Sequence, residues 1–591
     1  MSKSKLIRKQ LTFPPNLTDY ESTYRIFNLK RYESELTWFP DHKINAAYNA
    51  ITRHALGDRK NKIALYWQDE NGQKTKYTFA ELNNLSNQFG NVLKKLKIQP
   101  GERVFIFLPR VPELYLAFLG ILKIGVVAGT LFSAFGPQAL LDRLENSDAK
   151  ILVTNKELLL RVKKVWPQLP HLKKILLIDS DREQNSLLSF SKQLNQASTK
   201  LRVKAMDPSD PAFMLYTSGT TGKPKGVLHA HRAILHEHLT AKWVLDIKDA
   251  DVYWCTADPG WVTGIAYEIL GTWSNGASTV VYNGRFDPAS WYQIIQDYRV
   301  NVWYTAPTAI RMLAAAGLPL VKKYDLKSLR HLASVGEPLN PEAVYWGLKA
   351  FGLPFHDNYW QTETGGIVVA NYPCLPIKPG SMGKPVPGVK AEIVSDEGKV
   401  LPPHKEGNLA LRPGWPSMMK TIWRRPKKYQ SYFIGSPNRS QTTWYITGDR
   451  AYKDKDGYFW FIGRADDVIK TSGERVGPFE VESALVAHSK VVEAGVIGKP
   501  DPVRGEIIKA FVVLKEKSIR QLADKNKKYT ESLIEELQQF VKKQLAGHAY
   551  PREIEFIDKL PKTRSGKIVR RLLKAKELGQ ELGDTSTLEE F

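Results

Sequence analysis

The sequence predicts an α/β fold in which parallel sheets are covered by helices. Short runs rich in β-branched and aromatic residues alternate with longer segments of helical period. The strand-like runs are 63–67, 103–108, 150–154 and 174–178, a helical pattern spans 79–96, and an apolar helix is expected over 111–131. This alternation favours parallel sheets, because the connection between two parallel strands is usually a helix. No internal repeat is visible.

Length and composition favour a protein of two or three domains. The chain has 591 residues, of which 42% are hydrophobic and 25% charged, and single cores stop growing beyond about 250–300 residues. The basic N-terminus leads into no apolar run, and the most apolar segment carries Glu113 and Lys123, so neither a signal peptide nor a membrane span is expected. Cys255 and Cys374 form no CxxC pattern. We therefore expect a cytoplasmic protein without membrane contact.

The formal net charge of +24 could indicate nucleic-acid binding. The lysines and arginines are scattered, however, and the sequence has no basic arm, RNA-recognition signature or zinc-finger spacing. Most of these charges are interpreted as solvated faces, and a positive field would also favour small polyanionic substrates. Nucleic acid is therefore not expected as a partner.

The stretch 216–226, Tyr-Thr-Ser-Gly-Thr-Thr-Gly-Lys-Pro-Lys-Gly, has the chemistry of a phosphate-binding loop. Its glycines let the backbone turn successive N–H groups onto an anion, and its hydroxyls and lysines add donors and positive charge. It is not a Walker A loop, since Lys223 is followed by Pro224. A plain surface loop of this composition is the alternative interpretation.

Four histidines follow this loop, at positions 229, 231, 236 and 238. A zinc site is one interpretation of this concentration. Residues two apart on a helix point to different faces, so neither pair makes a helical chelate. We expect instead a helix that carries polar residues near the bound phosphate.

The loop and six further ordered motifs make the chain resemble the adenylate-forming superfamily of acyl-CoA synthetases, luciferases and peptide-synthetase adenylation domains. The other segments are 256–264, 335–339, 357–365, 445–449, 461–477 and 560–568. The resemblance extends from about residue 20 to residue 576 and is strongest to the AMP-forming acetyl-CoA synthetase family. It implies a large N-terminal domain, 1–465, of parallel or mixed sheets flanked by helices. It also implies a hinge at Asp466 and a small mobile α+β domain, 467–591.

The resemblance implies a site for ATP. The expected ATP-binding residues are Thr217, Ser218, Gly219, Thr220, Thr221, Gly222, Lys223, Gly336, Glu337, Pro338, Asp357, Asn358, Tyr359, Trp360, Gln361, Thr362, Asp449, Arg464 and Arg475. Lys567, Thr362 and Glu363 match the catalytic positions. Glu363 would bind Mg²⁺ with ATP, since a hard cation on phosphate prefers a carboxylate. Tyr359 replaces a tryptophan usual in the family, and Glu474 replaces a histidine.

The resemblance also implies sites for the acyl group, CoA and a structural cation. Trp261, Val262, Thr263, Val335 and Trp360 would form the acyl pocket, although core packing explains Trp261 and Val262 equally well. The indole of Trp360 would close this pocket to acids of acetate or propionate size. The residues that match CoA-binding positions are Thr263, Ser472, Gly473, Arg161 and Lys542, and those that match a carbonyl-bound cation are Val486, His488 and Val491.

The implied activity is an acetate–CoA ligase that uses ATP, acetate and CoA. A propionyl-CoA or medium-chain acyl-CoA synthetase is the alternative within this class. Trp360 disfavours the medium-chain enzyme. A non-catalytic nucleotide-binding regulator is an alternative of a different class, and the presence of both Glu363 and Lys567 disfavours it. A lysine acetyltransferase and a deacetylase acting on Lys567 are further expected partners, because acetylation would remove the charge of this residue.

Overall fold

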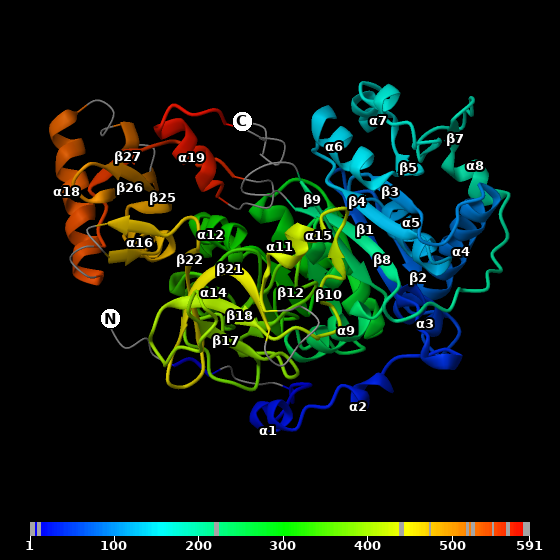
Figure 1. Ribbon diagram of the computed structural model, residues 1–591, viewed down its shortest axis with the longest axis horizontal. Coiled ribbons are helices and arrows are strands. Elements are labelled where there is room, and N and C mark those ends of the chain that lie inside the picture. The colour runs from blue at the N-terminus through cyan, green and yellow to red at the C-terminus, as the bar shows by residue number, and fades with distance from the viewer. Residues whose placement is uncertain are drawn as a thin grey trace.

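The computed structural model describes residues 6–8, 13–217, 224–435, 443–471, 474–515, 519–521, 526–545, 549–562 and 568–582. These residues form four β-sheets with helices packed around them. Figure 1 shows a large body and, beside it, a smaller C-terminal part that contains β25, β26, β27, α16 and α18. The predicted α/β fold is therefore confirmed. Among the described residues, every helix is too short or too polar to cross a bilayer.

The eight-stranded sheet has the order β19-β9-β8-β4-β3-β5-β6-β7 and is parallel from β8 to β7. Its strands are β3 (Arg103–Phe107), β4 (Val127–Leu131), β5 (Ile151–Thr154), β6 (Lys174–Leu177), β7 (Leu187–Ser189), β8 (Pro211–Thr217), β9 (Lys225–Ala230) and β19 (Thr421–Ile422). The adjacent helices are α4 (Phe79–Lys95), α5 (Pro112–Lys123), α6 (Pro137–Ser147), α7 (Lys156–Lys163) and α8 (Phe190–Asn195).

The apolar stretch 111–131 differs from its expected form. Helix α5 ends at Lys123, and the rest of the stretch is the central strand β4. Gly125, with φ of +76°, turns the chain between the two elements. A buried helix and a buried parallel strand are both continuously apolar, so the composition alone does not separate them.

The nine-stranded sheet has the order β16-β15-β14-β13-β12-β10-β11-β1-β2. Its strands are β1 (Ile63–Asp69), β2 (Lys74–Thr78), β10 (Val252–Cys255), β11 (Ser278–Asn283), β12 (Val302–Thr305), β13 (His331–Ser334), β14 (Phe355–Tyr359), β15 (Val369–Ala370) and β16 (Lys384–Pro385). Strands β12, β13 and β14 are parallel. Their carboxyl ends therefore meet at one edge, where ligands bind in open α/β sheets.

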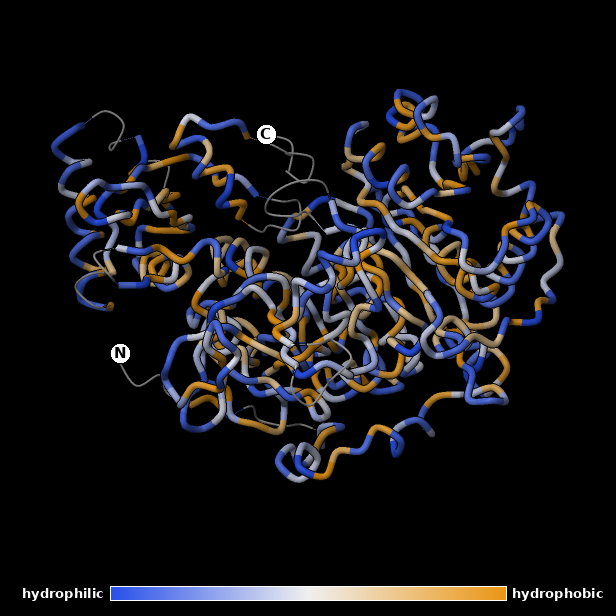
Figure 2. The backbone as a smooth tube through the Cα atoms, in the orientation of Figure 1, coloured by the Kyte–Doolittle hydropathy of each residue, from blue (hydrophilic) through white to orange (hydrophobic). Residues whose placement is uncertain are grey.

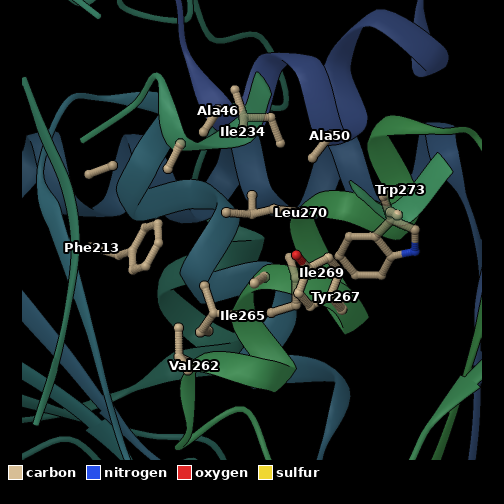
Figure 3. Close-up of a cluster of buried hydrophobic side chains, with 14 of the residues drawn as sticks. Ala46, Ala50, Phe213, Ile234, Val262, Ile265, Tyr267, Ile269, Leu270 and Trp273 are labelled. Atoms are coloured by element: carbon tan, nitrogen blue, oxygen red, sulfur yellow. The ribbon is translucent and has the colours of Figure 1, made fainter. Parts of the chain in front are cut away.

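The core between the two large sheets contains α9 (Ala233–Trp243), the π-helix η4 (Gly264–Leu270) and α10 (Gly271–Ser274). Figure 3 shows Ile265, Ile269, Leu270 and Trp273 gathered with Ala46 and Ala50 of the N-terminal segment. Figure 2 shows apolar residues inside the body and hydrophilic ones along much of α18 (Lys527–Gln544). The other helices of the large body are α1 (Tyr20–Arg25), α2 (Lys30–Glu33), α3 (Arg53–Ala55), α11 (Pro288–Asp297), α12 (Pro307–Ala316), α13 (Leu318–Val321), α14 (Pro341–Phe351) and α15 (Pro426–Gln430).

A five-stranded antiparallel sheet completes the large body. It contains β17 (Ala391–Val394), β18 (Gly407–Leu411), β20 (Phe433–Ile434), β21 (Trp444–Lys453) and β22 (Phe459–Arg464). The C-terminal part has its own sheet and hydrophobic core, so a separate C-terminal domain is confirmed. Its elements are β23 (Ile469–Thr471), β24 (Glu474–Val476), β25 (Val491–Asp501), β26 (Gly505–Leu514), β27 (Glu553–Phe556), α16 (Pro478–Val486), α18 and α19 (Arg570–Glu577). The hinge at Asp466 stays a prediction.

A hydrogen bond and a ring pair are among the contacts that join the C-terminal domain to the large body within the described residues. Asn340, just before α14, donates a hydrogen bond from Nδ2 to the Ser483 hydroxyl on α16 at 2.7 Å. The rings of Phe461 and Phe479 pack edge to face with centroids 6.1 Å apart. Both contacts involve α16, and each domain has its own core.

A buried ion-pair cluster fixes the N-terminal segment to the large body. Arg330 pairs with Asp246 at 2.6 Å and donates to Asp251 at 3.0 Å, and all three side chains are nearly inaccessible. Burial alone would lower the pKa of Arg330, but its hydrogen bonds to Asp251 and Asp246 raise it. Asp246 also accepts a hydrogen bond from the backbone N–H of Asn16 at 2.7 Å. The cluster thus links residues distant in sequence.

Replacing Arg330 should destabilise the protein strongly, because Arg330→Ala removes the cation paired with buried Asp251 and leaves buried Asp246, within the described residues, only Lys248, at 3.6 Å. We expect a loss of about 3–5 kcal/mol in the free energy of unfolding. Lys74→Ala is the matched control, since Lys74 pairs with Asp297 at the surface and should contribute about 0–1 kcal/mol. Urea unfolding of the two variants measures the difference. Equal losses would show that the Arg330 cluster contributes no more than a surface pair.

Candidate active site

The candidate site is built around the carboxyl ends of β12, β13 and β14. The turn after β13 contains Gly336, whose φ of +96° favours glycine. No described atom lies within 4 Å of a Cβ placed on Gly336, so the space above this turn is open to a flat ring. Glu337 is held by the Thr308 hydroxyl and by the Arg311 guanidinium, each at 3.0 Å. The open turn therefore has a rigid base.

A buried carboxylate joins three of the predicted motifs. Asp449 on β21 is 3% exposed and accepts hydrogen bonds from the Tyr359 hydroxyl and, at 2.9 Å, from Gln361 Nε2. Arg464 Nη1 lies 3.2 Å from its other oxygen. Burial, and then the charge of Asp449, raises the pKa of Tyr359 well above its ordinary value, so Tyr359 stays a hydrogen-bond donor. Tyr445 fixes Gln361 by donating to its Oε1 at 3.0 Å.

Glu363 lies in a smaller cluster with Lys225 and Tyr432. Tyr432 donates a hydrogen bond to Glu363 Oε1 at 3.2 Å and accepts one from Lys225 Nζ at 2.7 Å. Lys225 Nζ is 3.9 Å from the same carboxylate oxygen. The main chain of Glu363 is also fixed, since its carbonyl accepts from the Met419 N–H at 3.0 Å. Tyr432 belongs to no recognisable motif, so sequence analysis missed it.

The predicted acyl-pocket residues fall in two neighbouring apolar clusters. Val262 and Val335 are buried in the main core, and half-buried Trp360 packs against that core. Trp261 belongs instead to the cluster of the eight-stranded sheet, with its ring centroid 5.7 Å from that of Phe132. Thr263 lies at the start of η4.

The indole of Trp360 is held from two sides. Its N–H donates to the Tyr304 hydroxyl at 3.2 Å, and its ring meets the ring of Tyr267 edge to face at 5.0 Å. Tyr267 is itself fixed, because its hydroxyl accepts from the Ile367 N–H at 2.7 Å. Neither Tyr304 nor Tyr267 was predicted at the site. In the sequence, neither residue differs from an ordinary aromatic residue of a strand or a helix.

Asp357 and Asn358 are buried at the end of β14. Burial raises the pKa of Asp357 well above its ordinary value, and one oxygen of Asp357 accepts from the Leu339 N–H at 3.3 Å. Asn358 Oδ1 accepts from the Tyr304 hydroxyl at 2.7 Å. Within the described residues, Asn358 Nδ2 is buried and has no hydrogen-bond partner. This amide can therefore still donate to a ligand. The carbonyl of Thr362 accepts from the Gly365 N–H at 3.1 Å in the turn that follows.

The phosphate-loop prediction is only partly visible in the structure. Thr217 is the last residue of β8 and pairs in register with Lys225 on the antiparallel strand β9. The Thr217 hydroxyl is buried without a partner in the described part of the chain, which fits a donor aimed at a ligand. Outside the described residues lie Ser218, Gly219, Thr220, Thr221, Gly222, Lys223, Ser472, Gly473 and Lys567.

The remaining predicted residues lie on other surfaces. Arg475 is exposed on β24. The pKa of Asp396 is lowered first by the hydrogen bond from Asn408, and then by the charges of Arg450 and Arg475. Arg161 on α7 donates to the carbonyl of Ser133 at 3.0 Å. Lys542 Nζ lies 5.0 Å from the centroid of the Tyr550 ring, and His488 lies 3.2 Å from the Glu536 carboxylate. The Val491 N–H donates to the His488 carbonyl at 3.0 Å. Val486 ends α16.

The histidines after the phosphate loop are core residues with separate partners. His229 stacks on Phe213 at 4.9 Å, and burial lowers its pKa to about 4. His236 contacts the Ile367 carbonyl at 2.8 Å, whereas His238 contacts Glu35 at 3.1 Å. In the described ranges, no group of three or more His, Cys, Asp and Glu side chains could hold a metal ion.

Comparison with known proteins gives matches along the whole chain. The family model described as AMP-binding enzyme matches residues 52–423, and that of the AMP-binding enzyme C-terminal domain matches 480–567. Acetyl-coenzyme A synthetase of Bacillus subtilis (strain 168) is 55% identical, covering 97% of this chain and 98% of its own. The protein of the same name from Methanothrix thermoacetophila is 41% identical, covering 93% and 86%.

Two solved structures share the fold. The anthranilate CoA ligase AuaEII in complex with anthranoyl-AMP aligns with a TM-score of 0.81 at 31% identity, covering 91% of this chain and 98% of its own. An acyl-CoA synthetase of Brucella canis aligns with a TM-score of 0.72 at 35% identity, covering 95% and 99%. Since the first family model alone matches well over half of the sequence, the chain belongs to the AMP-binding enzyme family.

Proposed function

We propose that this protein is an acetate–CoA ligase that makes acetyl-CoA, AMP and diphosphate from acetate, ATP and CoA. The observation that carries the choice of acid is Trp360, whose indole is fixed by Tyr304 and Tyr267 against the apolar core that also contains Val262 and Val335. We infer that a fixed ring of this size limits the pocket to a short acyl chain. The relative with 55% identity is named for the same activity.

In the first half-reaction, an acetate oxygen attacks the α-phosphorus of ATP. A new O–P bond forms, the bond from this phosphorus to the bridging oxygen breaks, and diphosphate leaves with the electron pair. Negative charge gathers on the α-phosphoryl oxygens, so fixed donors and cations there lower the barrier. We assign this work to Lys567 and Thr362, with the Thr217 hydroxyl and the loop 218–223 holding the phosphates. The unpartnered, buried Thr217 hydroxyl supports that assignment.

The nucleoside would lie between the Gly336 turn and Asp449. The open face of the Gly336 turn, followed by Glu337 and Pro338, suits a flat adenine, and the Asn358 amide supplies a donor. Asp449 would accept hydrogen bonds from the ribose hydroxyls, with Arg464 beside it. Tyr359, Gln361 and Arg464 already orient the Asp449 carboxylate. Its side chain therefore loses little conformational entropy when ATP binds.

Magnesium fits Glu363. Mg²⁺ usually takes one or two carboxylates and obtains its other ligands from substrate phosphates and water. Glu363 is a 12% exposed carboxylate beside Tyr432 and Lys225, which matches this donor set. When bound, Mg²⁺ would offset phosphate charge.

In the second half-reaction, the CoA sulfur attacks the acyl carbon and the thioester C–S bond forms. The bond from this carbon to the AMP phosphate oxygen breaks, AMP leaves with the electron pair, and the thiol proton passes to water. We assign CoA binding to Thr263, Ser472, Gly473, Arg161 and Lys542, after rotation of the C-terminal domain about Asp466. Arg570, three residues after Lys567 in the sequence, donates from Nε to Glu482 on α16 at 2.8 Å, which fixes the start of α19 in the C-terminal domain.

The assignment has cellular consequences. ATP, CoA and acetate are small cytoplasmic metabolites, so we place the enzyme in the cytoplasm. Lys567 would lose its charge on acetylation, which makes a lysine acetyltransferase and a deacetylase its proposed protein partners. A carbonyl-bound cation at Val486, His488 and Val491, and phosphate binding by Arg475, complete the proposed sites.

Diphosphate release tests the proposed function. The purified protein is incubated with MgATP and a series of straight-chain acids from C2 to C8, with and without CoA. Release that depends on acetate and yields AMP and acetyl-CoA supports the proposal. Preference for propionate or a medium-chain acid would identify the alternative ligases, and the absence of acid-dependent release would indicate a nucleotide-binding regulator.

Lys567→Ala should separate the two half-reactions. It should slow acetyl-adenylate formation by about 10²–10³-fold, as removal of one transition-state contact does, because Lys567 acts on the α-phosphate. Conversion of supplied acetyl-adenylate and CoA to acetyl-CoA should continue at the rate of the unmodified enzyme. Lys576→Ala, at an exposed position of α19, is the control and should alter neither step. Equal loss in both steps would contradict the role given to Lys567.

Trp360→Gly should lengthen the preferred acid. The removed ring leaves space for further methylenes, so kcat/KM should rise for hexanoate and octanoate and fall for acetate, which loses its packing contact. Each methylene that fits is worth about 1–3 kcal/mol, or about 10–200-fold. Trp360→Phe keeps an aromatic ring, so its preference for short acids should fall far less than that of the glycine variant. An unchanged profile in the glycine variant would show that Trp360 does not limit chain length.

A further inference from the structure

The hydroxyl of Tyr304 connects the acyl pocket with the adenine side of the site. Tyr304 is fully buried on β12, where its oxygen accepts the Trp360 indole N–H at 3.2 Å and donates to Asn358 Oδ1 at 2.7 Å. Asn358 and Trp360 are two residues apart in an extended segment, so they point to the same side. Tyr359 between them points away, toward Asp449. The end of β14 thus directs side chains toward the proposed binding sites of two substrates.

The direction of the two hydrogen bonds is fixed by chemistry. An indole N–H can only donate, so the hydroxyl must accept from Trp360 and give its own proton to Asn358. This bond turns the Asn358 carbonyl toward Tyr304 and leaves the amide nitrogen on the opposite side. That nitrogen is buried and lacks a partner among the described residues. A ring nitrogen of adenine is an acceptor of the kind it needs.

The hydroxyl also restrains the rotation of the indole. Tyr267 contacts the Trp360 ring only by an edge-to-face arrangement, with an interplanar angle of 84°. Without Tyr304 Oη, the half-buried indole N–H would lose its one hydrogen bond in the described structure, and another ring orientation would become accessible. The acyl pocket would then lose its fixed wall.

We propose that Tyr304 is a positioning residue whose hydroxyl sets both the acyl-chain limit, through Trp360, and adenine binding, through Asn358. This inference rests on the proposed ligase function. Tyr304 acts through its two neighbours and reaches the substrates only indirectly. A single buried hydroxyl therefore adjusts the two binding sites together.

Tyr304→Phe tests the proposal with two readouts. The ratio of kcat/KM for acetate to that for butyrate should fall by about three- to tenfold, and KM for ATP should rise by a similar factor, as expected for one lost hydrogen bond. Tyr292→Phe is the matched control, because the Tyr292 hydroxyl is also buried but has no partner in the described part of the chain. It should change neither quantity. Equal losses for all acids with an unchanged KM for ATP would overturn the proposal.

Two further variants separate the branches and remain informative if Tyr304→Phe does not fold. Trp360→Phe lacks the indole N–H, so it should lower the acid ratio about as much as Tyr304→Phe does, while KM for ATP rises less than in Asn358→Asp. Asn358→Asp keeps an acceptor for Tyr304 but cannot donate, so it should raise KM for ATP and preserve the acid ratio. The reverse pattern in either variant would refute the coupling. Failure of the unmodified enzyme to release diphosphate with acetate would instead refute the ligase function.

Discussion

The parallel pairing of β12, β13 and β14 is the constraint on which the site depends. Register places Thr305 opposite Ser334 and Ser334 opposite Asp357, so the three chains leave the sheet at one edge. The turns that follow carry Gly336 and Trp360 into the same region. A slip of one residue in β14 would exchange the directions of Tyr359 and Trp360. The nucleotide side and the acyl side of the site would both be lost.

Burial restricts the orientation of the polar groups at this edge of the sheet, because each group needs a hydrogen-bond partner. Asp449 and Asn358 are nearly inaccessible, and an unsatisfied polar group in such surroundings is costly. Asp449 meets this requirement with Tyr359, Gln361 and Arg464. Asn358 Nδ2 and the Thr217 hydroxyl do not meet it within the described residues. Two of the buried polar atoms without a partner in the described part of the chain are thus atoms that the proposed reaction assigns to ATP.

The sequence predicted the fold class and the family correctly, and it failed where contacts cross between elements. The strands at 63–67, 103–108, 150–154 and 174–178 were predicted correctly because the residues of each segment alone indicate a strand. The stretch 111–131 was misread because a buried helix and a buried strand share one composition. Tyr304 and Tyr432 were missed, since nothing near them in the sequence shows that they contact Trp360 and Glu363. The roles given to Lys567 and Asp466 stay predictions.

The contact between Asn340 and Ser483 has a consequence for the speed of turnover. This hydrogen bond and the ring contact of Phe461 with Phe479 lie between two domains that each have their own core. A neutral hydrogen bond of this kind contributes only about 0.5–1.5 kcal/mol net. In the proposed rotation about Asp466, this hydrogen bond would break and form again in every catalytic cycle. Its small net contribution would then add little to the barrier between the two half-reactions.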